Sequence, residues 1–321
     1  MNKEQSKKKV NMQIVITLGV MVALFVLFTI LRPAYAGFTN IMSVLLSTCV
    51  NGCLSFGVTF VIISGGIDLS IGPVMTLTGV ISGVALTKWG LPLGLCIPLG
   101  LLVGVLCGVV NGIMVAKMHL APFIATLAMQ MIVKGLNLVI SGLMPIYFTS
   151  APFYQKIALG NVFGIEGFYS AIVVFIGVCI LAYLILHKTL LGRYTYAIGS
   201  NREAARLSGI KVDEWTIVIY ALSSLFAGFA GLIMTSRLNS AQPQLGPGYE
   251  TEAIAASVIG GTSMAGGEGS IIGVVIGVII ISELSNGLRV MAVSQEWQSV
   301  IIGAVLVASV YFDQLRNRKK A

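Results

Sequence analysis

The chain has 321 residues, of which 56% are hydrophobic and only 10% are charged, and its mean hydropathy is +0.94. A soluble globular protein carries about 25% charged residues, so this composition excludes an ordinary soluble enzyme, and it equally excludes a disordered chain. A net charge of +8 is better explained by basic loops on the cytoplasmic side of a membrane than by nucleic-acid binding. We therefore expect an all-α, polytopic membrane protein.

Ten apolar stretches are each about long enough to be a membrane helix. The first follows Lys7, Lys8 and Lys9 and is longer than the apolar part of a signal peptide, so we expect it to be retained. With the N-terminus inside, most of the Lys and Arg residues fall on the cytoplasmic side, which favours both termini in the cytoplasm and an even number of crossings. The ten stretches are residues 12–31, 41–63, 73–87, 92–116, 122–143, 169–186, 215–235, 250–261, 270–285 and 297–312.

Two of these stretches, 73–87 and 250–261, are short, and each lies next to a Gly-Gly pair, Gly65-Gly66 or Gly260-Gly261. Short, glycine-interrupted segments at similar places in two halves are typical of a transporter's central site, although close helix packing through glycine explains them as well. No linker divides the chain. We expect one permease domain over residues 1–321, with a basic cytoplasmic tail at 1–10 and a cytoplasmic segment at 187–214.

Motifs for catalysis are missing from the sequence. No Gly-x-x-x-x-Gly-Lys-Ser/Thr loop is present to cradle phosphates, and there is no Gly-x-Ser-x-Gly or Cys-x-x-Cys. The five cysteines lie in apolar stretches without His, Asp or Glu nearby to complete a metal site. We expect a chain that is not an enzyme, with no catalytic residue, no metal and no cofactor.

The first polar element joins two apolar stretches and contains Gly65, Gly66, Asp68 and Ser70. A carboxylate between two spans is costly unless it is hydrogen-bonded or hydrated. Asp68 and Ser70 could cap the helix that begins near Ile71. The segment could also line the path of a polar solute, and the two roles are compatible.

The second polar element is cytoplasmic and has the makings of a short helix. Ser200 or Asn201 is a good N-cap, Glu203 completes a capping box with Ser200, and Gly209 is placed to end the helix. A two-turn helix is unstable alone, so we expect it to dock, either in a groove of a partner protein or flat on lipid headgroups. The residues expected to make this contact are Ser200, Asn201, Arg202, Glu203, Ala204, Ala205 and Arg206.

The third polar element is predicted on the outer side. Gln242 and Gln244 lie in a turn-rich segment, and Glu250 and Glu252 follow at the start of a short helix. The acids complement the helix dipole, or the whole segment is a docking surface. A glycine-rich turn with Gly260, Gly261, Thr262 and Ser263 follows, and its backbone could face a water-filled cavity.

Three segments occur in order along residues 38–313: Gly65-Gly66-Ile67-Asp68-Leu69-Ser70, then 191–210 with Leu191-Gly192-Arg193-Tyr194, then 240–267 with Ser240-Ala241-Gln242-Pro243. Together they resemble the ribose-type sugar permease of bacterial ATP-binding-cassette importers, in the branched-chain amino acid and ribose permease family. The resemblance implies about ten helices in the inner membrane of a bacterial cell, a homodimer in lipid, a separate cassette ATPase on the cytoplasmic side and an extracytoplasmic sugar-binding protein on the outer side. It also implies that residues 200–209 are the coupling helix.

On this basis the expected function is passage of a monosaccharide, ribose or a related sugar. The Gly-Gly turns, with Asp68, Ser70, Thr262 and Ser263, would line the path, and Gln242, Gln244, Glu250 and Glu252 would dock the binding protein. A permease for branched-chain amino acids or nucleosides is the alternative within the same superfamily. An ion-coupled carrier is a third possibility, and it would need a titratable relay from Lys134, Asp68 or Glu283.

Overall fold

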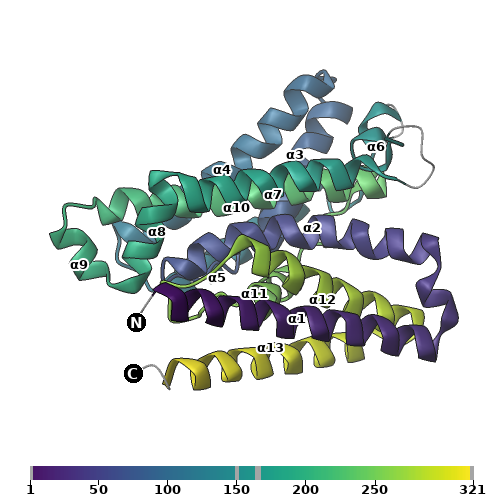
Figure 1. Ribbon diagram of the computed structural model, residues 1–321. Helices are drawn as coiled ribbons and strands as arrows, with labels where there is room; N and C mark the ends of the chain where they lie inside the picture. Colours follow the sequence, from purple (N-terminus) through teal and green to yellow (C-terminus); the bar gives the residue numbers. More distant parts are fainter. Residues whose placement is uncertain (1–2, 149–151, 163–167, 319–321) are drawn as a thin grey trace.

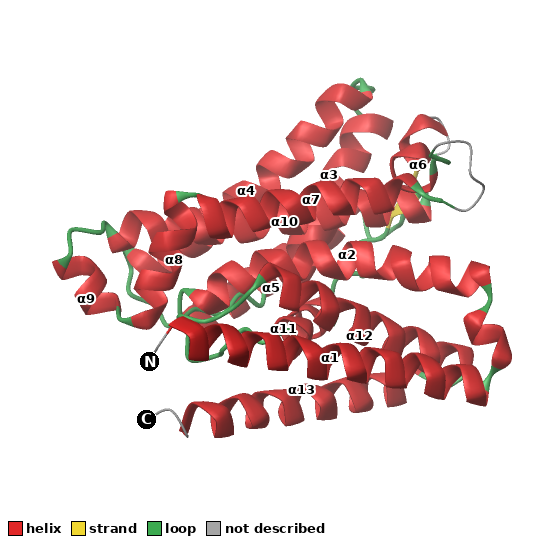
Figure 2. Ribbon diagram, viewed as in Figure 1, coloured by secondary structure: helices red, strands yellow, loops and turns green. Residues whose placement is uncertain are grey.

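The computed structural model describes residues 3–318 apart from 149–151 and 163–167. Each of the ten apolar stretches forms or overlaps a helix, as Figure 1 and Figure 2 show. The helices are α1 (Lys3–Leu31), α2 (Phe38–Ile63), α3 (Ile71–Thr87), α4 (Leu93–Ala116), α5 (Pro122–Ser141), α6 (Pro152–Leu159), α7 (Ser170–Lys188), α8 (Leu190–Ser200), α9 (Arg202–Leu207), α10 (Val212–Leu238), α11 (Tyr249–Ile259), α12 (Ile271–Val290) and α13 (Gln295–Arg318).

Among the described residues, seven helices are long and apolar enough to cross a membrane, namely α2, α4, α5, α7, α10, α12 and α13. The expected number of about ten spans is therefore not confirmed. The difference lies in shorter helices. The apolar parts of α1 and α3 reach 17 residues at most, and α11 has 11 residues, or about 16 Å at 1.5 Å per residue.

Helix α2 lies at the centre of the bundle. In its most apolar stretch 94% of the residues are buried, against 22% for α4 and for α7. Helices α10, α11, α12 and α7 pack against α2, and α10 also packs along α4 and α3. The apolar outer faces of α4, α5 and α7 are exposed in the isolated chain, as expected for helices that contact lipid or a second subunit.

The two ends of the bundle differ. The N-terminus, the C-terminus and α9 lie at one end, and α6 lies at the other (Figure 1). At the α6 end a two-stranded antiparallel sheet joins β1 (Ile146–Tyr147) to β2 (Ser240–Ala241), and the 3₁₀ helix η1 (Pro33–Ala36) links α1 to α2. Termini at the same end agree with an even number of crossings. The predicted basic tail forms the start of α1, except for residues 1 and 2, which lie outside the described residues.

Helices α2 and α11 end in the same way. After α2, the N–H of Gly66 donates to the carbonyl of Val61 and Gly65 takes a φ of +82°. After α11, the N–H of Thr262 donates to the carbonyl of Ser257 and Gly261 takes a φ of +94°. Both ends are Schellman caps, in which a left-handed residue follows the helix and favours glycine.

Candidate functional site

Asp68 lies in the α2–α3 connection and is fully buried. Its Oδ1 accepts hydrogen bonds from the backbone N–H of Ser70 at 3.0 Å and from the Ser70 hydroxyl at 2.7 Å. Its Oδ2 accepts from the Ser223 hydroxyl on α10 at 2.9 Å. Asn111 on α4 donates to Ser70 at 2.8 Å. The carboxylate is thus the centre of a buried network that joins the connection to α10 and α4.

The hydrogen bonds of this network hold the turn that precedes the short helix α3. Helix α3 begins at Ile71 with Ser70 as its N-cap, as expected, but no side chain caps it directly. Asp68 instead bonds the cap residue itself and so fixes the turn that precedes the helix. Tyr220 of α10 holds the same turn by donating to the carbonyl of Ile67 at 3.2 Å.

The glycine-rich loop that follows the second Gly-Gly turn meets the end of α2. The N–H of Gly267 donates to the carbonyl of Ile63, at the end of α2, at 2.8 Å. Gly199 of α8 lies in the same place: a Cβ added there would overlap the carbonyl oxygen of Ile63, and one added at Gly266 would be 2.8 Å from the carbonyl oxygen of Gly199. We call Gly65, Gly199, Gly266, Gly267 and the Ile63 carbonyl the glycine junction.

Side chains close the glycine junction from two sides. The Tyr196 hydroxyl, on α8, donates to the carbonyl of Gly269 at 2.7 Å. Burial raises the pKa of Tyr196 to about 12, so it stays a donor at all physiological pH values. On the other side Asp313 of α13 accepts from the Ser263 hydroxyl at 3.2 Å and from the N–H of Met264 at 3.1 Å. The turn after α11 is therefore fastened to both α8 and α13.

The predicted cytoplasmic helix is present as α9. Asn201 is its N-cap, with Oδ1 accepting from the N–H of Ala204 at 2.9 Å, and Gly209 follows its end with a φ of +84°. The expected capping box between Ser200 and Glu203 does not form, because Ser200 is the last residue of α8 and leaves Asn201 alone at the cap position.

The surface of α9 points away from the bundle. Ala205 is buried against the chain, while Leu207 is 81% exposed. The other exposed members are Arg202, Glu203, Ala204 and Arg206. Arg202 is tied back to Asp213 at 3.5 Å, whereas Arg206 has no ion pair among the described residues. An exposed leucine beside an unpaired arginine is a surface suited to a protein partner.

The outer segment has an exposed part and a buried part. Gln242 and Gln244 are exposed. Glu250 is buried, accepting from the side-chain N–H of Gln130 at 3.0 Å and from the N–H of Gly248. Glu252 points inward and accepts from Asn51 of α2 at 2.7 Å. The two acids thus anchor the segment from inside.

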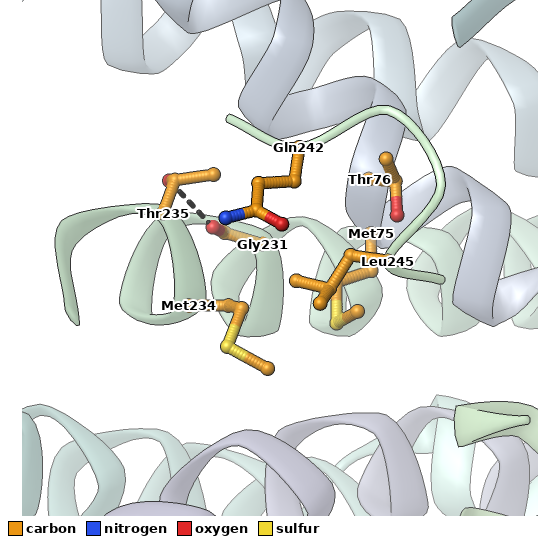
Figure 3. A pocket seen from close by; sticks show the side chains of 7 residues that line it. All are labelled: Met75, Thr76, Gly231, Met234, Thr235, Gln242 and Leu245. Carbon is orange, nitrogen blue, oxygen red and sulfur yellow. Dashed lines mark hydrogen bonds between the residues drawn. The ribbon is translucent and has the colours of Figure 1, made fainter. Parts of the chain in front are cut away.

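Two cavities lie beneath this segment. The larger, of about 50 Å³, lies among α2, α10, α11 and α12, and its polar lining includes Asn51, Arg237, Glu252, Asn286 and Arg289. The smaller, of about 10 Å³, lies below Gln242 between α3 and α10, and Figure 3 shows two methionines at its base. A water needs about 10–15 Å³, so only the larger cavity can hold several polar groups.

Glu283 and Lys134, the other two residues of the possible titratable relay, do not belong to the buried network around Asp68. Glu283 of α12 is buried, and its Oε2 has no hydrogen-bond partner among the described residues. The Tyr35 hydroxyl donates to the Glu283 backbone carbonyl and not to its carboxylate. Lys134 of α5 is exposed on the outer face of the chain. Within one chain these side chains and Asp68 form no continuous line.

Sequence reasoning missed the buried polar partners. Ser223 donates to Asp68, Asn51 donates to Glu252, and Asn111 donates to the Ser70 hydroxyl, yet none of the three belongs to a motif. A signal was present, because asparagine in the middle of an apolar stretch must find a partner in the bilayer.

The comparisons with known proteins agree with this architecture. The family model for the permease component of branched-chain amino acid transport systems matches residues 40–310. The ribose import permease protein RbsC of Bacillus subtilis is 43% identical over 94% of this chain and 93% of its own length. The protein of the same name from Escherichia coli K12 is 38% identical, again over 94% and 93%. The xylose transport system permease protein XylH of Haemophilus influenzae is 33% identical over 98% and 99%. No solved structure matches.

A bundle of apolar helices without catalytic motifs, with buried polar turns and an exposed short helix at one end, defines a multi-pass transport permease. The chain belongs to the family of branched-chain amino acid transport system permease components. Within that family its reported relatives are sugar permeases.

Proposed function

We propose that this chain is the permease subunit of an ATP-binding-cassette importer that carries a monosaccharide, ribose or a related sugar, into the cell. The observation that carries the proposal is the 43% identity, over nearly the whole length, to a protein named as a ribose import permease. A permease for branched-chain amino acids is less well supported, because the reported relatives at 33–43% identity are all named for sugars.

The partners follow from the two ends of the bundle. A cassette ATPase docks at α9, where Arg206 and Leu207 are exposed. The N-cap at Asn201 and the buried Ala205 fix this helix on α8, so a push on α9 moves α8. An extracytoplasmic sugar-binding protein docks at the opposite end, where Gln242 and Gln244 face outward and Glu250 and Glu252 hold the segment from inside. Both termini are then cytoplasmic.

The translocation pathway runs between two copies of this chain in the lipid bilayer. In one copy the polar turn residues Asp68, Ser70, Thr262 and Ser263 are buried. The larger cavity within one copy has only about 50 Å³, less than a whole sugar ring needs. The turns border the pathway, and at the glycine junction α8 contacts the end of α2 and the glycine-rich loop that follows α11. The bordering residues are Gly65, Gly66, Asp68, Ser70, Gly260, Gly261, Thr262 and Ser263.

Reconstitution tests the function directly. The chain is placed in proteoliposomes with its cassette ATPase, the sugar-binding protein and ATP, and uptake of radiolabelled D-ribose, D-xylose and L-leucine is measured. We expect ATP-dependent uptake of a sugar and none of leucine. The chain alone is expected to hydrolyse no ATP and to accumulate no sugar. Accumulation by the chain alone under a proton gradient would favour an ion-coupled carrier and reject the proposal.

A further inference from the structure

The larger cavity brings buried charge and unpaired polar groups against an open space. It has a volume of about 50 Å³, and at about 10–15 Å³ for a water it has room for roughly three to five oxygen atoms with their hydrogens. Its walls come from α2 and from the three consecutive helices α10, α11 and α12. Such convergence of polar side chains on one cavity is typical of a binding site for a small molecule.

The asparagines of the cavity carry the first argument. Asn51 is 4% exposed and Asn286 is 6% exposed, and both line the cavity. The Oδ1 atoms of both side chains have no hydrogen-bond partner in the part of the chain that the structure describes. Buried acceptors are nearly always paired, and one left without a donor costs about 1–3 kcal/mol. These two atoms therefore call for a hydroxyl or another donor within the cavity.

The guanidinium groups carry the second argument. Arg237 reaches the cavity from the end of α10, where its Nη1 is 3.4 Å from the Ser47 hydroxyl, and Arg289 reaches it from the last turn of α12. Neither forms an ion pair within the described part of the chain. Their N–H groups can thus donate to a ligand. Arg289 is exposed, so the cavity is open to the outside on that side.

The mixture of donors and acceptors selects the class of ligand. Two arginines donate, while the Asn51 and Asn286 oxygens and the Glu252 carboxylate accept. An inorganic anion could pair with the two arginines, but without a donor it would leave both asparagine acceptors unpaired. A sugar hydroxyl both donates and accepts, so adjacent hydroxyls satisfy the two kinds of group together. Tyr249 adds a ring face to the same wall.

The cavity lies on the side of the bundle that is opposite α9. It lies among the first half of α2, the end of α10, the start of α11 and the second half of α12, away from the glycine junction. Asn51 precedes Ile63, at the glycine junction, by 12 residues of helix, or about 18 Å. A ligand there would be held on the side of the segment with Gln242 and Gln244, opposite α9.

We propose that this cavity binds the hydroxyl-bearing edge of a monosaccharide as it passes through the permease. The inference rests on the proposed function and adds to it a transient sugar-binding site within the subunit. The cavity is too small for a whole sugar ring, so two or three hydroxyls enter it and the rest of the ring lies towards Arg289. The site holds sugar transiently, between its delivery by a binding protein and its release inside.

Direct binding to the full-length chain tests the proposal without transport. The purified permease in nanodiscs is titrated with tritiated D-ribose by scintillation proximity, with unlabelled D-ribose, inorganic phosphate and L-leucine as competitors. We expect saturable binding that D-ribose displaces and that phosphate and leucine do not. Since an unpaired buried group costs about tenfold or more in affinity, Asn286→Leu should raise Kd by at least that factor. Asn286→Ser, a milder change, covers the case in which the leucine variant does not fold.

A matched control is available on α2, the helix that carries Asn51. Thr39→Ala changes an exposed polar residue that does not line the cavity and should leave Kd within about twofold of the unmodified chain. Equal Kd values in the folded Asn286 variants and the unmodified chain would overturn the proposal, as would displacement by phosphate or the absence of saturable binding.

The same variants separate this inference from the proposed function. In proteoliposomes with all partners, the unmodified chain should take up D-ribose, and Asn286→Ser should lower uptake at limiting sugar more than at saturating sugar. If the complete importer takes up sugar normally but the isolated chain binds none, the proposed function stands and the transient binding site is rejected. If the complete importer moves no monosaccharide, both fail together.

Discussion

The backbone N–H of Gly267 donates to the backbone carbonyl of Ile63 at 2.8 Å, and this bond joins the turn after α11 to the end of α2. The two helices end in matching Schellman caps and belong to different halves of the chain. Because Gly199 of α8 lies against the same carbonyl, any movement of α8 is felt by both turns. In backbone contacts of this kind a shift of one segment moves the other directly, because no side chain can absorb the shift by changing its rotamer.

A methyl group at Gly199 should break this contact. A Cβ there would overlap the Ile63 carbonyl oxygen and lie 2.7 Å from the Gly267 nitrogen, so backbone must move. Overpacking of this kind costs about 1–3 kcal/mol. We expect Gly199→Ala to lower the midpoint of thermal unfolding in detergent and to abolish ATP-dependent sugar uptake.

The control for this prediction is Gly177→Ala on α7, where a Cβ meets nothing within 4 Å. Alanine favours helix over glycine by about 1 kcal/mol, so this variant should be as stable as the unmodified chain or more so. Unimpaired uptake by Gly199→Ala at equal expression would show that the glycine junction is not needed for transport.

Asp68 offers a test between its two expected roles. Asparagine at this position keeps the Oδ1 that accepts from Ser70, and the Ser223 hydroxyl can rotate to accept from the new N–H₂. Because the carboxylate is fully buried within this network, we expect Asp68→Asn to retain most uptake and stability. Asp68→Ala leaves three donors unpaired and should cost about 1–3 kcal/mol for each that stays buried.

The comparison is made by size-exclusion profile, thermal midpoint and uptake for both variants. If Asp68→Asn folds with an unchanged midpoint but loses uptake, the negative charge itself serves the passage of solute and the structural interpretation is wrong.

The sequence predicted the parts of this molecule that depend on local rules. Apolar length located ten of the helices among the described residues, and residue chemistry offered Ser200 or Asn201 as the N-cap and Gly209 as the end of the short helix. The structure selects Asn201 as the cap and gives Gly209 a left-handed conformation. The number of full spans was less predictable, because an apolar run of 11–17 residues is compatible with a half-helix as well as with a tilted span.

The polar contacts between helices distant in the chain could not be predicted from the sequence. Asn51 meets Glu252 across 201 positions, and Asp68 meets Ser223 across 155. Such pairs arise from the register in which α2, α10 and α11 pack, and no periodicity in one segment specifies that register. The cavity beside Glu252 could not be predicted for the same reason. Each helix contributes only isolated polar residues within or beside an apolar stretch, and nothing in the sequence shows that they face one another.

Reversing the charge of Arg206 tests the coupling role of α9. The side chain is exposed and lacks an ion pair among the residues that the structure describes, so Arg206→Glu should leave the midpoint of unfolding unchanged. A like-charge contact in an interface costs several kcal/mol. We expect sugar uptake and co-purification of the ATPase to fall by about tenfold or more. Lys88→Glu, an exposed reversal in the α3–α4 loop, should change neither. Full uptake by Arg206→Glu would place the ATPase elsewhere.

The ion-coupled alternative makes its own prediction at Glu283. The carboxylate is buried on α12 with one oxygen unpaired, and a buried carboxyl without partners is costly to fold around. Glutamine has the same shape and cannot exchange a proton. If the chain is an ATP-driven permease with no relay, Glu283→Gln should transport sugar at the rate of the unmodified chain, with a midpoint of unfolding that is equal or higher. The measurement is uptake driven by ATP at pH 6 and pH 8, with and without a proton ionophore. Loss of uptake in the folded variant, together with sensitivity to the ionophore, would identify Glu283 as a proton-carrying group and return the carrier mechanism to favour.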